Sequence, residues 1–134
     1  MRTQKRTVEI EEDDGTIVRY NRHDKGGGLV SPGADVAADV VIGELAYVEA
    51  GARIGRRSNI GAGSWVEHGA TIGEDVVVGG NSRIGRNCEV SNGCRVGYGA
   101  RIGAGARIGP GVAIEPDARI GKGATYTRQS QRAA

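Results

Sequence analysis

A six-residue repeat runs through most of this chain and limits what it can fold into. Every sixth residue from Val36 to Ile120 is Val or Ile, the residue two positions earlier is small or slender, and Gly usually follows the aliphatic residue. Residues two apart face the same side of an extended strand, and Gly suits a sharp corner where a side chain would be hindered. The repeat therefore predicts short strands separated by corners, wound into a coil.

Composition supports a narrow interior in a single domain. The chain has 134 residues with 24 Gly, no Phe and only 4% aromatic residues, which does not suit a wide mixed core. Its 18 basic and 16 acidic residues give a net charge of +2, so overall charge favours neither a nucleic acid nor a membrane as partner. No apolar run is long enough for a signal peptide or a membrane span, and we expect a cytoplasmic protein.

From about Val30 to Tyr126 the repeat resembles the pattern [Ile/Leu/Val]-Gly-x-x-[small]-x of the hexapeptide-repeat acyltransferase superfamily. The resemblance implies an all-β fold, a left-handed parallel β-helix of about five coils of 18 residues each. It also implies three parallel sheets and a homotrimer. The left-handed winding comes from the resemblance alone, because parallel crossovers are ordinarily right-handed.

The two ends of the chain break the repeat. Residues 1–28 predict a β-hairpin cap, in which Thr7 to Tyr20 form two strands around an Asp-Gly turn and three glycines join the cap to the coil. Residues 29–126 form the predicted β-helix. Residues 127–134 are polar and basic, and we expect a loose tail.

Side chains 18 residues apart should stack about 4.8 Å from each other along each wall. The predicted outward columns are Tyr47, Trp65, Arg83, Arg101, Arg119; Asp35, Arg53, Thr71, Glu89, Arg107, Thr125; and Val41, Asn59, Val77, Arg95, Ala113. The second column mixes charges and suits solvent, and the third, which is partly apolar, is our choice for the subunit interface.

The first column favours an anionic ligand. Stacked arginines repel one another unless an acid or anion lies between them, and Trp65 is placed for a cation–π contact with Arg83. We therefore name Trp65, Arg83, Arg101 and Arg119, together with Arg86 at the adjoining corner, as candidates for binding a carboxylate, a phosphate or an acidic partner. The alternative is that the arginines point into water or across a trimer interface.

His68 is the candidate general base. The segment "SWVEHGATIGE" resembles part of the nucleotide-sugar and sialic acid acetyltransferases, in which a His in this register deprotonates the acceptor that attacks an acyl thioester. Those enzymes place an acid where this chain has Gly69, so Glu67 or a residue of another subunit would have to orient the ring. Arg86 should stack above His68 at the same corner.

Other chemistries have less support. The γ-class carbonic anhydrases share this fold but bind zinc through three histidines, whereas this chain has only His23 and His68, so we predict no metal site of that kind. Cys88 and Cys94 take the inward small position and are expected to be buried free thiols.

Two functions remain open, and the sequence does not decide whether the chain is an enzyme. Our first hypothesis is a non-catalytic scaffold or interaction module, because no loop interrupts the repeat and His68 has no adjacent acid. The alternative is an acetyl-CoA- or other acyl-CoA-dependent transferase that uses His68 as base on a sugar or a small amine or hydroxyl acceptor.

Overall fold

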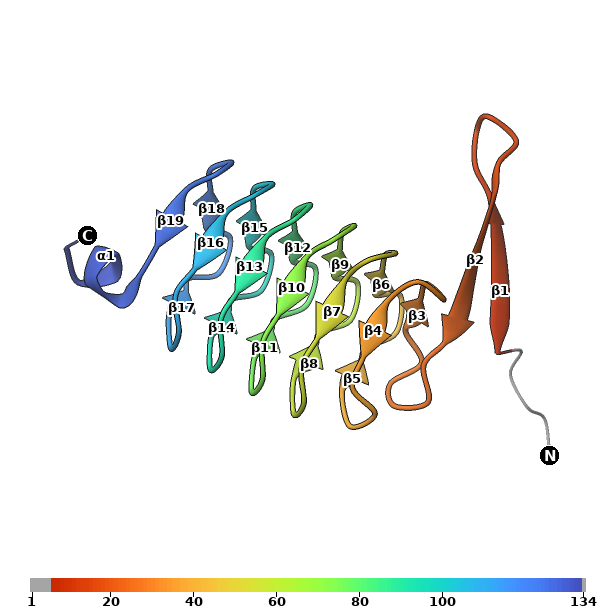
Figure 1. The fold of residues 1–134 in the computed structure, drawn as a ribbon, viewed down its shortest axis with the longest axis horizontal. Helices are drawn as coiled ribbons and strands as arrows, with labels where there is room; N and C mark the ends of the chain where they lie inside the picture. The colour runs from red at the N-terminus through yellow and green to blue at the C-terminus, as the bar shows by residue number, and fades with distance from the viewer. Residues whose placement is uncertain (1–5, 134) are drawn as a thin grey trace.

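The computed structural model describes residues 6–133 as a row of stacked coils, with a hairpin at the N-terminal end and a short helix at the C-terminal end (Figure 1). Each complete coil has three two-residue strands, one on each wall. Five such coils follow one another from β3 to β17, and β18 and β19 begin a further one. The predicted left-handed parallel β-helix is confirmed, with hardly any helix in the described residues.

Three sheets run the length of the coil, and we call them A, B and C. Sheet A contains β1 (Thr7–Glu11), β2 (Ile17–Arg22), β3 (Leu29–Val30), β6 (Tyr47–Val48), β9 (Trp65–Val66), β12 (Arg83–Ile84), β15 (Arg101–Ile102) and β18 (Arg119–Ile120). Sheet B contains β4 (Asp35–Val36), β7 (Arg53–Ile54), β10 (Thr71–Ile72), β13 (Glu89–Val90), β16 (Arg107–Ile108) and β19 (Thr125–Tyr126). Sheet C contains β5 (Val41–Ile42), β8 (Asn59–Ile60), β11 (Val77–Val78), β14 (Arg95–Val96) and β17 (Ala113–Ile114).

The register is 18 residues throughout the parallel part of the sheets. Arg83 pairs with Trp65 on one side and with Arg101 on the other, and the corresponding pairs in sheets B and C keep the same spacing. Inside, the Val and Ile residues of the repeat stack into one continuous core together with the small residues that precede them. All three predicted outward columns are therefore confirmed as neighbours in space.

The structure shows why glycine recurs directly after the inward aliphatic residue at the corners. A Cβ placed on Gly85 would lie 2.6 Å from the carbonyl oxygen of Ile102, so Gly is needed there because the next coil approaches closely. The left-handed backbone falls two residues later, for example at Asn87, where φ is 58°. Four of the six non-glycine residues that take this conformation within residues 6–133 are Asn or Asp, which tolerate it better than most residues, and the other two are Leu45 and Arg57.

The N-terminal cap extends sheet A beyond the first coil. Strands β1 and β2 form an antiparallel hairpin, and β2 continues the sheet through an antiparallel pairing with β3. At the hairpin tip, Gly15 has a φ of 86° and Asp14 accepts a hydrogen bond from the backbone N–H of Thr16. The predicted Asp-Gly hairpin is confirmed, and it covers the edge of β3.

The C-terminal segment differs from the loose tail that we expected. Residues Arg128–Ala133 form helix α1, and the Thr127 hydroxyl accepts a hydrogen bond of 3.1 Å from the backbone N–H of Ser130. This contact is an N-cap, which satisfies one of the free donors of the first turn. Within residues 6–133, no helix is long and apolar enough to cross a membrane.

Candidate functional site

The predicted aromatic and arginine column lies on the outer face of sheet A. Trp65 is neighboured by Tyr47 and Arg83, and the ladder continues through Arg101 to Arg119. The Arg83 guanidinium lies 4.6 Å from the centre of the Trp65 ring, which is the predicted cation–π contact. The hexad register alone places these residues together.

Two glutamates on sheet A take the corner position that Gly takes in the later coils. Glu49 and Glu67 directly follow the inward valines of β6 and β9, whereas Gly85, Gly103 and Gly121 occupy this position in the next three coils. Both glutamates are buried, with 6% and 7% of their surface exposed. A buried carboxylate requires strong hydrogen-bond donors or a counter-charge.

Glu49 receives its donors from the cap and from sheet A. The Tyr20 hydroxyl donates to its Oε1 at 2.8 Å, and the Trp65 indole N–H donates to its Oε2 at 2.8 Å. Burial, together with the hydrogen bond to Glu49, raises the pKa of Tyr20 well above its usual range. The contact fixes the hairpin against the coil. Tyr20 and Glu49 were not among the predicted site residues, although a glutamate in a position that glycine usually occupies was a visible signal.

Glu67 receives its counter-charges from two arginines. Its Oε2 lies 2.6 Å from Nε of Arg83, and its Oε1 lies 3.8 Å from Nε of Arg86. The contacts continue from Tyr20 through Glu49 and Trp65 to this ion pair. The carboxylate of Glu67 is thus held by the arginines, and no hydrogen bond within residues 6–133 joins it to the ring of His68.

A groove of about 430 Å³ begins at Glu67 and runs along sheet A and its corner with sheet B. Its floor includes the backbone of Gly85, Gly103 and Gly121, where no side chain fills the space. Its cationic walls and apolar lining are Arg83, Arg86, Arg101, Arg119, Lys122, Ile102, Ala104 and Ile120. The hexad register predicts that the arginines lie together, but the groove was not predicted, because it depends on the buried side chains of Glu49 and Glu67 at one end of a row of glycines.

Positive charge is uneven along this groove. Arg83 and Arg86 share the carboxylate of Glu67, whereas Arg101, Arg119 and Lys122 have no acidic partner among the described residues. The Glu67 end is therefore largely compensated and the Lys122 end is strongly cationic. This arrangement attracts a ligand that carries several negative charges at one end only.

His68 lies on the corner at the Glu67 end of the groove. Its carbonyl oxygen accepts a hydrogen bond from the backbone N–H of Asn87, and Gly69 N–H donates to the carbonyl of Ala50, so Ala50, His68 and Arg86 stack as predicted. The side chain is exposed, and its ring has no hydrogen-bond partner within the described part of the chain. The imidazole is thus open to solvent.

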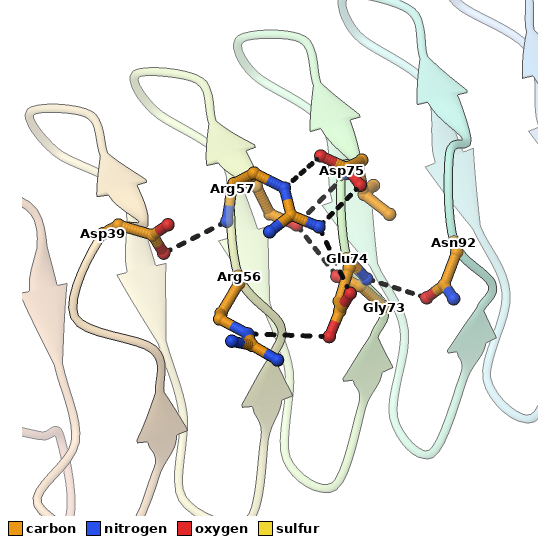
Figure 2. A network of polar contacts seen from close by, with 9 residues as sticks. Asp39, Arg56, Arg57, Gly73, Glu74, Asp75 and Asn92 are labelled. Atoms are coloured by element: carbon orange, nitrogen blue, oxygen red, sulfur yellow. Dashed lines mark hydrogen bonds and ion pairs between the residues drawn. The ribbon is translucent and has the colours of Figure 1, made fainter.

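A second polar cluster occupies the corner between sheets B and C (Figure 2). The Arg57 guanidinium binds both carboxylate oxygens of Asp75, at 2.8 and 3.1 Å, and also reaches Glu74, which Arg56 approaches. The hydrogen bond from Arg57 lowers the pKa of Asp75. Because these groups are exposed and satisfy one another, we assign the cluster to joining neighbouring corners rather than to binding.

The remaining candidates play structural parts. The ring Nε2 of His23 lies 2.6 Å from the carbonyl oxygen of Val40, beside the glycine-rich join. Cys88 and Cys94 are buried free thiols that donate to the carbonyl oxygens of Gly103 and Gly109, and burial raises both pKa values. No group of three His, Cys, Asp or Glu side chains suited to a metal ion occurs in residues 6–133.

Comparison with known proteins finds the same repeat and fold in acetyltransferases. Residues 51–84 match the hexapeptide repeat of succinyl-transferase. A variant of perosamine N-acetyltransferase from Caulobacter crescentus, solved in complex with CoA and GDP-perosamine, is 33% identical with a TM-score of 0.71, over 75% of this chain and 47% of that chain. The acetyltransferase domain of PglB from Neisseria gonorrhoeae is 28% identical with a TM-score of 0.72, over 72% of this chain and 47% of that domain.

Further matches add to this picture. The PglB domain is also solved in complex with acetyl coenzyme A. A Bacillus cereus protein described as a putative acetyltransferase is 18% identical, with a TM-score of 0.53 over 70% of this chain and 69% of that chain, and shares the fold alone. A search of curated protein sequences found no significant match. The chain spans about half the length of the first two solved acetyltransferases.

Proposed function

We propose that this chain, which has the hexapeptide repeat and the left-handed β-helix of known acetyltransferases, transfers an acyl group from acyl-CoA to an amine or hydroxyl acceptor. The observation that carries this proposal is that the exposed His68 directly follows Glu67, the lining residue at one end of a one-sided cationic groove. The groove alone would indicate ligand binding without catalysis. His68 alone would have no adjacent site for an acyl donor.

The groove residues fit coenzyme A in charge and in length. Arg101, Arg119 and Lys122 offer guanidinium and ammonium donors to phosphates at one end of the groove. From the coil of Lys122 to the coil of His68 there are three coil spacings, about 14 Å, which suits an extended arm between phosphates and thioester. The glycine floor and the side chains of Ile102 and Ala104 leave an uncharged path between the two ends.

His68 is the residue that moves the proton. A bound acyl-CoA supplies a thioester carbonyl, which the acceptor nitrogen or oxygen attacks as the carbon–sulfur bond breaks. The neutral imidazole of His68 takes the proton from the acceptor and returns it to the departing sulfur, so the products are the acylated acceptor and a free thiol. Glu67 keeps Arg83 and Arg86 in place beside this corner.

The site would be completed in a homotrimer, as we expected from the sequence. On the outer column of sheet C, Val77 is 48% exposed, and at the corner between sheets C and A, Leu45 is 76% exposed and Tyr98 is 58% exposed. Large exposed apolar side chains of this kind suit a contact between subunits. A neighbouring subunit could then supply the acid that Gly69 does not provide.

A scaffold without catalysis is the second candidate, and one observation favours it. Glu67, the nearest carboxylate in the sequence, binds Arg83 and Arg86, and no described residue hydrogen-bonds to the ring of His68. In that case the arginine column of sheet A would bind an acidic partner surface.

One set of measurements separates the two candidates. Acetyl-CoA should raise the melting temperature of the wild-type chain, and Arg101→Glu should abolish this shift. Arg53→Glu, which changes the equivalent outward position on sheet B, should leave the shift intact. With a panel of amino sugars and small alcohols, release of free CoA measured by chromatography should fall about 10²- to 10⁴-fold in His68→Ala. Absence of any shift at millimolar acetyl-CoA would refute the transferase and leave the scaffold.

A further inference from the structure

The groove ends abruptly at Glu67, and the lower coils explain why. Beyond Glu67, the equivalent position holds Glu49, whose carboxylate is covered by Tyr20 and Trp65. In the upper coils the same position is Gly85, Gly103 and Gly121, and the groove stays open over all three. The length of the groove is therefore set by where glutamate replaces glycine in one column.

Glu67 forms a firm end wall rather than a mobile one. Its side chain is 10% exposed, and its two carboxylate oxygens are held by different arginines. The Arg83 guanidinium also lies 4.6 Å from the centre of the Trp65 ring, so the residue that binds Glu67 is itself held in place. Two anchored oxygens and a stacked partner leave this side chain little rotational freedom.

The uneven charge fixes which end of a donor would meet this wall. The uncompensated cations Arg101, Arg119 and Lys122 attract the phosphates, so the thioester and its acyl group would point toward Glu67 and His68. The acyl chain beyond the thioester would therefore press against the Glu67 side chain.

We propose that Glu67 determines acyl specificity by closing the groove, so that the protein accepts a short acyl group and excludes longer ones. This inference rests on the proposed function, because it takes the groove to be the acyl-CoA site. Removing the side chain would lengthen the groove by one coil, about 4.8 Å, before Glu49 and Trp65 close it again. That extra length is enough for a few methylene groups.

The test is the affinity of the full chain for acetyl-, butyryl- and hexanoyl-CoA, measured by calorimetry. In the wild type, hexanoyl-CoA should bind at least about tenfold more weakly than acetyl-CoA, because added methylenes meet a closed wall. In Glu67→Ala, the difference should fall below about threefold. Glu67→Ser provides a second truncation if Glu67→Ala does not fold.

Two control variants show whether the chain-length dependence comes from the volume of the Glu67 side chain, from its charge, or from a general effect of replacing a glutamate. Glu67→Gln removes the charge but keeps the volume, and it should keep the chain-length dependence of the wild type. Glu115→Ala changes a glutamate at the equivalent hexad position on sheet C, away from the groove, and should also behave like the wild type.

The outcomes distinguish this inference from the proposed function. If no CoA thioester binds the wild type, the proposed function fails and the inference fails with it. If the thioesters bind but the truncated variants keep the chain-length dependence of the wild type, only the role of Glu67 is overturned. If Glu67→Gln loses the dependence as fully as Glu67→Ala, charge rather than space sets the limit, and the end-wall explanation is wrong.

Discussion

Removing one hydroxyl group from the cap should measurably weaken the fold. In Tyr20→Phe, Glu49 keeps its bond to Trp65 but loses the 2.8 Å hydrogen bond from the Tyr20 hydroxyl. A hydrogen bond to a charged group contributes about 1.5–3 kcal/mol, and leaving a buried acceptor without its donor costs a similar amount. We therefore expect Tyr20→Phe to lower the free energy of unfolding by about 2 kcal/mol.

The loss should be visible because the hairpin strands pair with the coil over a short edge. Strand β2 pairs with β3 over only two residues, Asn21 with Val30 and Arg22 with Leu29, and the join that follows β2 is rich in glycine. Tyr20 is 6% exposed and packs edge-on against Tyr47, with the ring centres 5.2 Å apart. The substitution leaves this ring contact in place, so the measurement isolates the hydrogen bond.

Urea unfolding followed by tryptophan fluorescence is the appropriate assay. Trp65 is the only tryptophan in the chain, and its indole N–H donates to the same carboxylate, so its emission reports directly on this contact. Wild type and variants should be compared at one protein concentration, because self-association would add to the apparent stability.

Tyr47→Phe is the matched control. The Tyr47 hydroxyl has no hydrogen-bond partner among residues 6–133, and its removal should change stability by less than about 0.5 kcal/mol. Equal effects of the two substitutions would refute the reasoning, because the loss would then come from the rings and not from the bond to Glu49.

Much of the fold could be predicted because the inward Val or Ile of the repeat recurs fifteen times at six-residue spacing. The inward Val and Ile residues fix the 18-residue register, and the register in turn places Trp65 beside Arg83 and His68 below Arg86. Each of these neighbours follows from backbone geometry alone. No knowledge of side-chain conformation is needed to predict them.

The contacts that sequence analysis missed depend on side-chain direction and on docking. Tyr20 reaches Glu49 across 29 residues, from a cap that lies outside the repeat, so no register relates the two. Glu67 could turn toward His68 or toward the arginines of sheet A, and only the structure shows that it binds Arg83 and Arg86. The short helix α1 depends on one hydroxyl group, that of Thr127.

Two further predictions concern the coil itself. Because Arg57 lowers the pKa of Asp75, the pair stabilises the fold above the ordinary carboxyl value of 3.8 and loses this contribution as the pH falls below it. Thermal melts of Arg57→Gln should therefore show a shallower loss of stability on acidification than the wild type. In the core, Ile84→Ala should cost about 4 kcal/mol in urea unfolding, since ladder hydrogen bonds hold the neighbouring coils about 4.8 Å apart and prevent collapse into the cavity. Ile120→Ala, in the partly exposed last coil, should cost clearly less because that end can relax, and equal losses would show that coil spacing does not control the cost.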